Sequence, residues 1–275
     1  MWEVCPWSGE EVVYIMTCET VGWWRPHSSS LDSKAAASSA DLALSMDWGY
    51  GETGATGPDH WHLHYPLATT GTRQSPVDIV TSQTVALTSP SLSVEYSEAS
   101  DLAILNTGAS WQVQLDTSQC SVCVGGQTYR AAQCHAHWGG SEHSVDGEKA
   151  EAELHIVHYN TKYETLGRAV DKSDGLAVLG ILLTLQGELQ DQTACTELDK
   201  ICRHLPDIEL RDSSTNIQEE LSLERLLPAD RSYFTYLGSL TTPPLLESVT
   251  WILFKHPVTV TEQQVTGSVQ TLRQR

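Results

Sequence analysis

From about residue 93 onwards, apolar and polar residues follow the two-residue period of β-strands. SWQVQL (110–115) and EAELHIVHY (151–159) alternate in this way, and VTWILF (249–254) also has the composition of a strand. LAVLGILLTL (176–185) is a continuous apolar run, short enough to be a strand that is buried on both faces. The pattern predicts a mainly β protein with a large, twisted, mostly antiparallel central sheet.

Two segments have the spacing of helices. Apolar residues at 198, 201, 202 and 205 form an i, i+3, i+4, i+7 stripe. A second, shorter helix is expected over 217–226, ending before Pro228. Helices are therefore few, and we place them at the periphery of the sheet.

The N-terminal part of the chain has a different composition. Residues 28–45 are rich in Ser and Ala and have no clear core face. We therefore expect residues 1–46 to be a poorly structured lead and residues 47–275 to form a single domain. No run approaches the roughly 20 apolar residues of a transmembrane helix, and early acidic residues do not fit a secretory signal.

Charge and cysteine content restrict the partners and the compartment. The chain has 16 basic and 35 acidic residues, a net charge of −19. Such a field repels nucleic acid and anionic membrane surfaces, so neither is expected as a partner. Seven irregularly spaced cysteines do not resemble a disulfide framework. We expect a reduced, cytoplasmic monomer.

The candidate chemistry begins in RAAQCHAHWGG (130–140). On a strand, Gln133, His135 and His137 project from one face. Two such imidazoles are either metal ligands or satisfied polar residues. His155, on the strand 151–159, supplies a third imidazole at a distance suited to a neighbouring antiparallel strand. Three histidines that leave one tetrahedral position open are typical of catalytic zinc.

Each of two candidate ligands has a polar partner two residues earlier on its own face. Gln133 can accept a hydrogen bond from His135, and Glu153 can accept one from His155, which fixes the orientation of each ring. His158 points to the opposite face and is interpreted as a core histidine.

Two other patterns in the sequence could indicate a metal site. DHWHLHY contains His60, His62 and His64, but it lies in Gly- and Pro-rich chain and is better interpreted as carrying surface histidines. His135, His137 and Glu142 also fit the His-x-His-x4-Glu pattern of cupins. The glycine expected before that pattern and a second cupin motif are both missing.

Seven segments together resemble the α-class carbonic anhydrases over roughly residues 47–275. They are WGYGETGATGPDHW with YPLATTGTRQSPVDI, then AQCHAHWG, GSEHSVDG, AELHIVHYNTKY, DGLAVLGILL and YLGSLTTPPLLESVTW, in the order of that family. The resemblance implies reversible hydration of CO2 to bicarbonate and a proton by hydroxide on Zn²⁺. It also implies that His135, His137 and His155 are the zinc ligands.

The same resemblance assigns further roles. Thr241 accepts the hydrogen of the hydroxide and donates its own to Glu142. The remaining positions form an apolar CO2 pocket and a polar side that holds ordered water. The apolar positions are Val157, Val178, Leu240, Val249 and Trp251, and the polar ones are Thr242, Gln112 and Tyr50.

The sequence departs from the family pattern in several places. Ala109 stands where fast members have a proton-shuttling histidine, which predicts a slower enzyme with no such shuttle. The connection between Trp138 and Glu142 is about five residues shorter than usual, which is expected to pull Glu142 away from Thr241. Ala68 and Leu245 stand where secreted members commonly form a disulfide, as in the cytosolic branch.

A further departure is at the C-terminus. The sequence ends at SVQTLRQR, before the family's usual final segment, which normally completes the sheet and supplies a carbonyl to His137. This departure keeps one alternative open, a non-catalytic carbonic anhydrase-like binding domain that retains its zinc site.

Overall fold

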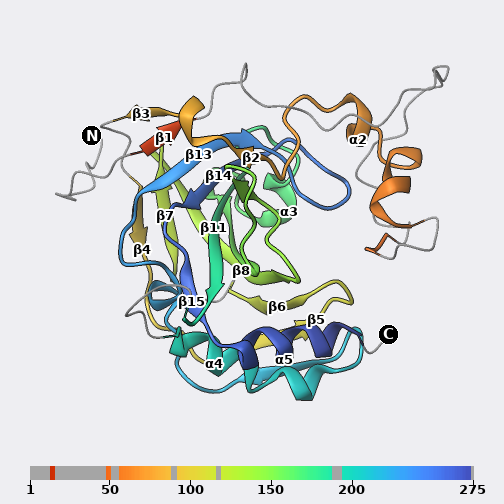
Figure 1. Cartoon of the computed structure of the whole chain (residues 1–275), viewed down its shortest axis with the longest axis vertical. Coiled ribbons are helices and arrows are strands. Elements are labelled where there is room, and N and C mark those ends of the chain that lie inside the picture. The colour runs from red at the N-terminus through yellow and green to blue at the C-terminus, as the bar shows by residue number, and fades with distance from the viewer. Residues whose placement is uncertain are drawn as a thin grey trace.

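The computed structural model describes residues 13–15, 48–50, 56–87, 92–115, 119–187 and 194–273. Within them, one large sheet dominates (Figure 1). Its main path runs in the order β12 (Ser214–Ile217), β5 (Leu102–Asn106), β6 (Trp111–Gln114), β8 (Gln127–Trp138), β10 (Ala152–Asn160), β11 (Leu176–Leu185), β14 (Val249–Phe254), β13 (Tyr233–Gly238), β1 (Val13–Ile15) and β3 (Val85–Leu87).

Three further strands join this sheet beside the main path. β15 (Val258–Val260) pairs with β11, and β7 (Ser121–Val124) pairs with β8 and with β4 (Ser93–Glu95). Among the described strands of this sheet, pairing is antiparallel except for β1–β13, β11–β14 and β11–β15. A separate parallel pair consists of β2 (Asp78–Ile79) and β9 (Ser144–Val145). The predicted mainly β, mostly antiparallel architecture is confirmed.

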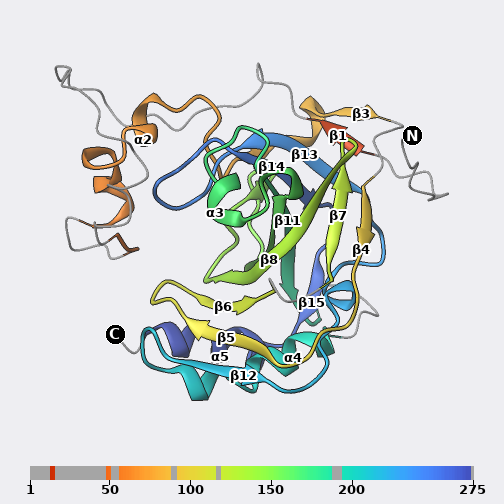
Figure 2. The same cartoon turned by 180° about the vertical axis from the view of Figure 1, so that it is seen from behind.

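Helices are short and lie around the sheet (Figure 2). The α-helices are α2 (Leu67–Thr70), α3 (Leu166–Ala169), α4 (Thr196–Cys202) and α5 (Glu262–Arg273). The 3-10 turns are η1 (Pro58–Leu63), η2 (Thr81–Gln83), η3 (Thr161–Tyr163), η4 (Leu205–Ile208) and η5 (Leu223–Leu226). α5 packs on α4 and η4, and α3 packs on β10. No helix in the described ranges has the length and apolar character that crossing a membrane requires.

The two helical predictions had different outcomes. The stripe at 198–205 is confirmed as α4, which gives way to the 3-10 turn η4 around Pro206. The helix over 217–226 was wrong, because Ile217 ends a strand that pairs with β5 and Leu221 forms a bridge to Ala99. Only the short turn η5 follows, since these pairings already bury the apolar side chains.

The two faces of the central strands have separate cores. One face buries Leu154 and Ile156 of β10 with Cys134 and Ala136 of β8 in the larger apolar cluster. The opposite face carries Glu153, His155 and Val157, and a smaller apolar cluster covers its far end. Strand alternation therefore places a polar row against an apolar wall on one face.

Part of the predicted N-terminal lead is a strand. Val13–Ile15 form β1, while residues 1–12 and 16–47 lie outside the described residues. The prediction of a poorly structured lead for those residues stays a prediction.

Candidate active site

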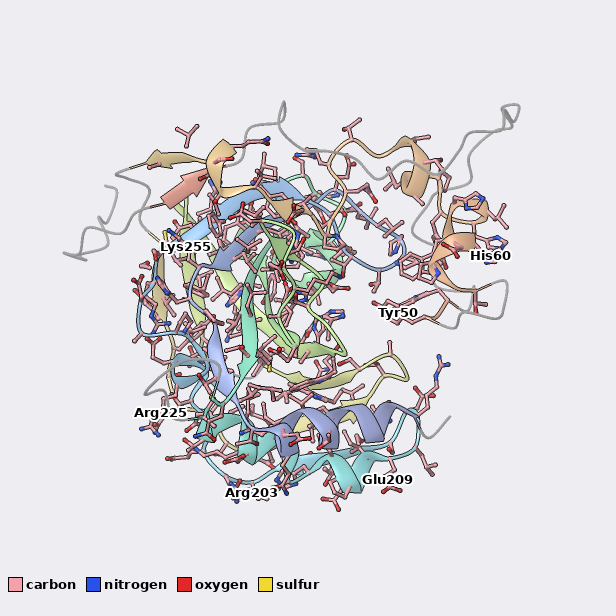
Figure 3. The ribbon with its side chains drawn as sticks, in the orientation of Figure 1. Tyr50, His60, Arg203, Glu209, Arg225 and Lys255 are labelled. Carbon is pink, nitrogen blue, oxygen red and sulfur yellow. The ribbon has the colours of Figure 1, made fainter. Side chains whose placement is uncertain are left out.

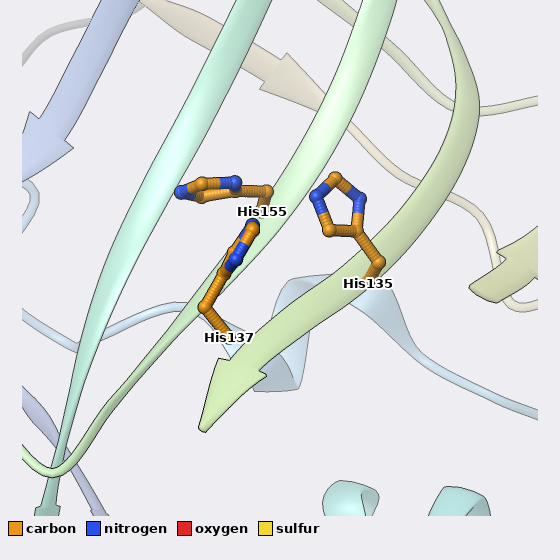
Figure 4. Close-up of side chains that lie close together, drawn as sticks. All are labelled: His135, His137 and His155. Carbon is orange, nitrogen blue, oxygen red and sulfur yellow. The ribbon is translucent and has the colours of Figure 1, made fainter. Parts of the chain in front are cut away.

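Three histidines meet at the centre of the sheet (Figure 4). His135 on β8 is paired directly with His155 on β10, and His137 follows on the same face of β8. The ring centroids lie 4.8–5.1 Å apart. One ring nitrogen from each histidine lies within 4.8 Å of those of the other two. The spacing inferred from the sequence therefore brings all three rings together.

In two of these histidines, one ring nitrogen contacts a polar side chain, and this contact orients the ring. Nδ1 of His135 lies 2.8 Å from Oε1 of Gln133, and Nε2 of His155 lies 2.8 Å from Oε1 of Glu153. Nε2 of His135 and Nδ1 of His155 are thereby left for another partner. Both hydrogen bonds were predicted from the two-residue spacing, and both are present.

His137 supplies the observation that best tests metal binding. Its Nε2 is buried and has no hydrogen-bond partner, while its Nδ1 lies 3.3 Å from Oε1 of Glu142. An unsatisfied buried nitrogen is costly unless another group binds it. Because this nitrogen belongs to the cluster of three imidazoles, the donor set fits one Zn²⁺ ion with an open fourth position.

The electrostatic environment favours neutral imidazole at two positions. Burial, and then the charge of His155, lower the pKa of His135 to about 3. Burial, followed by the charges of His155 and His135, holds the pKa of His137 well below its usual value. At His155 burial lowers the pKa, but Glu153 outweighs burial, so the pKa is raised.

Glu153 connects the cluster to a second buried row that the sequence analysis did not single out. Its Oε1 lies 2.6 Å from Nδ1 of His143, whose backbone N–H donates to Oε2 at 2.8 Å. Nε2 of His143 lies 2.6 Å from the hydroxyl of Tyr236, which lies 2.9 Å from Oγ of Ser75. Strand spacing gives no hint of these contacts, because His143 lies outside the strands, and Tyr236 and Ser75 are far from it in the sequence.

Glu142 lies at the edge of the cluster. Burial raises its pKa, and the charge of His155 and the neighbouring Thr241 hydroxyl oppose this rise. Oε2 of Glu142 is buried and has no hydrogen-bond partner among the described residues, so the expectation that the short connection from Trp138 pulls Glu142 away from Thr241 stays a prediction. The connection turns through Gly139 and Gly140, with φ of 86° and 122°, conformations that favour glycine.

The predicted apolar wall is assembled on one face of the sheet. Val157 is paired with Val178, and Val178 with Trp251, across three neighbouring strands. All five predicted wall positions belong to one apolar cluster, in which Leu240 is partly buried. They are Val157, Val178, Leu240, Val249 and Trp251. Nε1 of Trp251 donates to the carbonyl of Ser239 at 3.0 Å.

The predicted polar positions lie on separate segments. Gln112 on β6 is paired with His135, and Thr242 is half-buried directly after Thr241. Tyr50 is 38% exposed and packs edge-on against Trp48 and Trp61 (Figure 3). Partial burial and the charge of Glu142 raise its pKa.

The four other histidines that the sequence analysis named lie where it placed them. His60, His62 and His64 are exposed on or next to η1, and Figure 3 shows His60 farther from the sheet than Tyr50. His158 is fully buried, with Nε2 2.7 Å from the hydroxyl of Tyr96.

Comparison with known proteins identifies this arrangement. The model of the eukaryotic-type carbonic anhydrase family matches residues 56–275. Carbonic anhydrase 7 of Homo sapiens is 43% identical over 232 residues, which cover 79% of this chain and 83% of the human protein. Carbonic anhydrase 7 of Mus musculus is 42% identical over 231 residues, with the same coverage. The chain belongs to the eukaryotic-type carbonic anhydrase family.

This membership settles the class of reaction. The chain is a carbonic anhydrase, a lyase that hydrates CO2. The family depends on zinc in general, and the described residues of this carbonic anhydrase contain a histidine cluster suited to that ion. The cupin interpretation is excluded by the family match.

Proposed function

We propose that this carbonic anhydrase hydrates CO2 reversibly with Zn²⁺ held by His135, His137 and His155. One observation carries the assignment: the buried, unpartnered Nε2 of His137 lies in the cluster of three imidazoles. Zn²⁺ held by three histidines lowers the pKa of water in its open position, and carbonic anhydrases are the reference example of this effect.

The residues around the histidines have separate roles in orienting the attacking oxygen and in binding CO2 and water. The Thr241 hydroxyl and the Glu142 carboxylate, whose pKa Thr241 lowers, orient the attacking oxygen. The wall made by Val157, Val178 and Trp251 offers uncharged CO2 an apolar surface, extended by Leu240 and Val249. Gln112, Thr242 and Tyr50 form the polar side that holds ordered water.

Gln133 and Glu153 hold two of the rings in place. Burial raises the pKa of Glu153, but the charges on His143 and His155 outweigh it and lower the pKa well below the usual value. An ionised Glu153 accepts from both imidazoles and fixes the tautomer of His155.

We infer a slower enzyme than carbonic anhydrases that have a histidine at the position of Ala109. Ala109 lies in the turn between β5 and β6 and offers no group that accepts a proton. The proton must leave through water and buffer. General acid–base groups typically contribute about 10²–10⁴-fold, and we place the loss near the lower end.

We also propose that the protein works in the cytoplasm as a monomer. Each of the five described cysteines is a free thiol: Cys120, Cys123, Cys134, Cys195 and Cys202. Leu245 belongs to a small apolar cluster against which Ala68 packs, so these two positions join segments through apolar contact where secreted relatives use a disulfide.

Zinc content tests the proposed ligand set. Purified protein is expected to retain about one zinc per chain, measured by inductively coupled plasma mass spectrometry after dialysis against metal-free buffer. His137→Ala should weaken zinc binding by more than about 100-fold, since even outer contacts are worth about 10–100-fold. His62→Ala removes an exposed histidine and is the matched control, with zinc content unchanged. Zinc well below one equivalent in the unsubstituted protein contradicts the assignment.

A further inference from the structure

Strand β1 comes from a part of the chain that lies outside the family match. It consists of Val13–Ile15, whereas the family match begins at residue 56. Nevertheless β1 is an internal strand, parallel to β13 on one side and antiparallel to β3 on the other. Both views show it between those two strands (Figures 1 and 2). A segment outside the matched domain therefore occupies an interior position of the domain's sheet.

The pairing shows what depends on this segment. Val13, Tyr14 and Ile15 lie opposite Tyr233–Thr235 of β13 and opposite Val85–Leu87 of β3. Among the described strands, β3 pairs with β1 alone, so β1 is its link to the sheet. Without β1, one side of β13 is an open edge with unpaired N–H and C=O groups.

β13 is also a strand on which the active site depends. Tyr236 on β13 contacts His143, which in turn contacts Glu153. The chain leaves β13 at Gly238 and reaches Thr241 three residues later. Pairing on both sides of β13 therefore supports the strand that leads directly into the site.

We propose that the position between β13 and β3 is a binding site for an extended strand, and that residues 13–15 of the same chain occupy it. The occupant has suitable chemistry, because Val, Tyr and Ile are strong strand formers. The N-terminal segment is thus a structural part of this carbonic anhydrase and completes its sheet. This inference does not depend on zinc or on catalysis.

The first test breaks the strand without substituting any residue of the site. Tyr14→Pro removes a backbone N–H that must face one of the two neighbouring strands. We expect the melting temperature to fall by about 5–10 °C. Hydrogen exchange at the Tyr233–Thr235 amides should become at least about tenfold faster. Zinc content should stay at about the level of the unsubstituted protein.

The matched control for this variant is Tyr14→Thr, which keeps the N–H and the strand propensity. It should leave hydrogen exchange at Tyr233–Thr235 within about twofold of the unsubstituted protein. Equal exchange rates in Tyr14→Pro and the unsubstituted protein would overturn the proposal.

The second test asks which chain supplies the strand. Tyr14 and Ala86 lie directly opposite each other in an antiparallel pair, a separation that a disulfide spans. In a background with Cys5→Ser and Cys18→Ser, the double variant Tyr14→Cys and Ala86→Cys should cross-link under mild oxidation. The peptide pair is identified by mass spectrometry of the monomer band, with Tyr14→Cys alone as control.

The outcomes separate the possible occupants. A cross-link within the monomer supports the proposal. A cross-linked dimer would show that a second copy fills the position, and absence of any cross-link would show that residues 13–15 do not lie there. Either of these results overturns the assignment.

Discussion

Gln133 and Glu153 show how far single residues were predictable. Each stands two positions before a histidine on one strand face, and each contacts that histidine at 2.8 Å. Strand alternation makes such pairs local, so the sequence is enough to predict them. The contacts of His143 with Tyr236 and of Tyr236 with Ser75 depend on packing between distant segments, and no local pattern encodes them.

At the residue scale, Ala109 gives the first prediction. Ala109→His places a titratable imidazole in the turn before β6, whose Gln112 is paired with His135. We expect kcat for CO2 hydration in dilute buffer to rise by about 10–100-fold. The measurement is stopped-flow hydration with and without added imidazole, which should speed the unsubstituted enzyme more than the variant.

A histidine elsewhere is the control for this effect. Ala86→His lies on β3, at the far end of the sheet path, and is exposed. It should leave kcat and the response to imidazole unchanged. If imidazole fails to raise kcat in the unsubstituted enzyme, the absence of a shuttle at Ala109 does not limit its rate.

At the element scale, β11 has a glycine at a position where a side chain would crowd the site. Gly180 is paired with His155, and a Cβ added there would lie 2.8 Å from Cδ1 of Leu253 and 3.2 Å from Oε1 of Glu153. Glycine at this point gives the Glu153 carboxylate room beside the histidine it orients. The apolar run 176–185 predicted the strand but not the need for this glycine.

Gly180→Ala should therefore disturb the metal site through packing. We expect zinc affinity to fall by about 10–100-fold, since Glu153 must shift. Overpacking should lower the free energy of unfolding by about 1–3 kcal/mol. Chelator competition and urea unfolding measure the two effects.

Another glycine allows a matched comparison. Gly167 lies in α3, and an added Cβ there meets nothing within 4 Å. Gly167→Ala should keep zinc affinity and change stability by less than about 1 kcal/mol, in the stabilising direction. Equal zinc affinity in both variants would show that Gly180 has no part in placing Glu153.

At the scale of single elements, the predictions were correct where the sequence pattern was clear. The run at 176–185 and the segment 249–254 coincide with β11 and β14, because both are short and rich in apolar and β-branched residues. Residues 217–226 have apolar spacing that fits a short helix. Their actual form is set by pairing with β5 and by the Ala99–Leu221 bridge, which the local sequence does not contain.

At the scale of the whole molecule, the sheet places parts that are far apart in sequence around one centre. β8 and β10 carry the histidines, β11 and β14 the apolar wall, and the chain after β13 carries Thr241. The sequence predicted the architecture and the histidines together. It did not predict β1, because a strand of only three residues gains its form from the two neighbours it joins.

The most direct test of the account is stopped-flow CO2 hydration on zinc-quantified protein in an inert buffer. The same preparation stripped of metal by a chelator is the control. We predict turnover above the uncatalysed rate that scales with zinc content and disappears in the stripped protein. One zinc per chain with no turnover would contradict the proposed mechanism and favour a retained metal site in a binding domain.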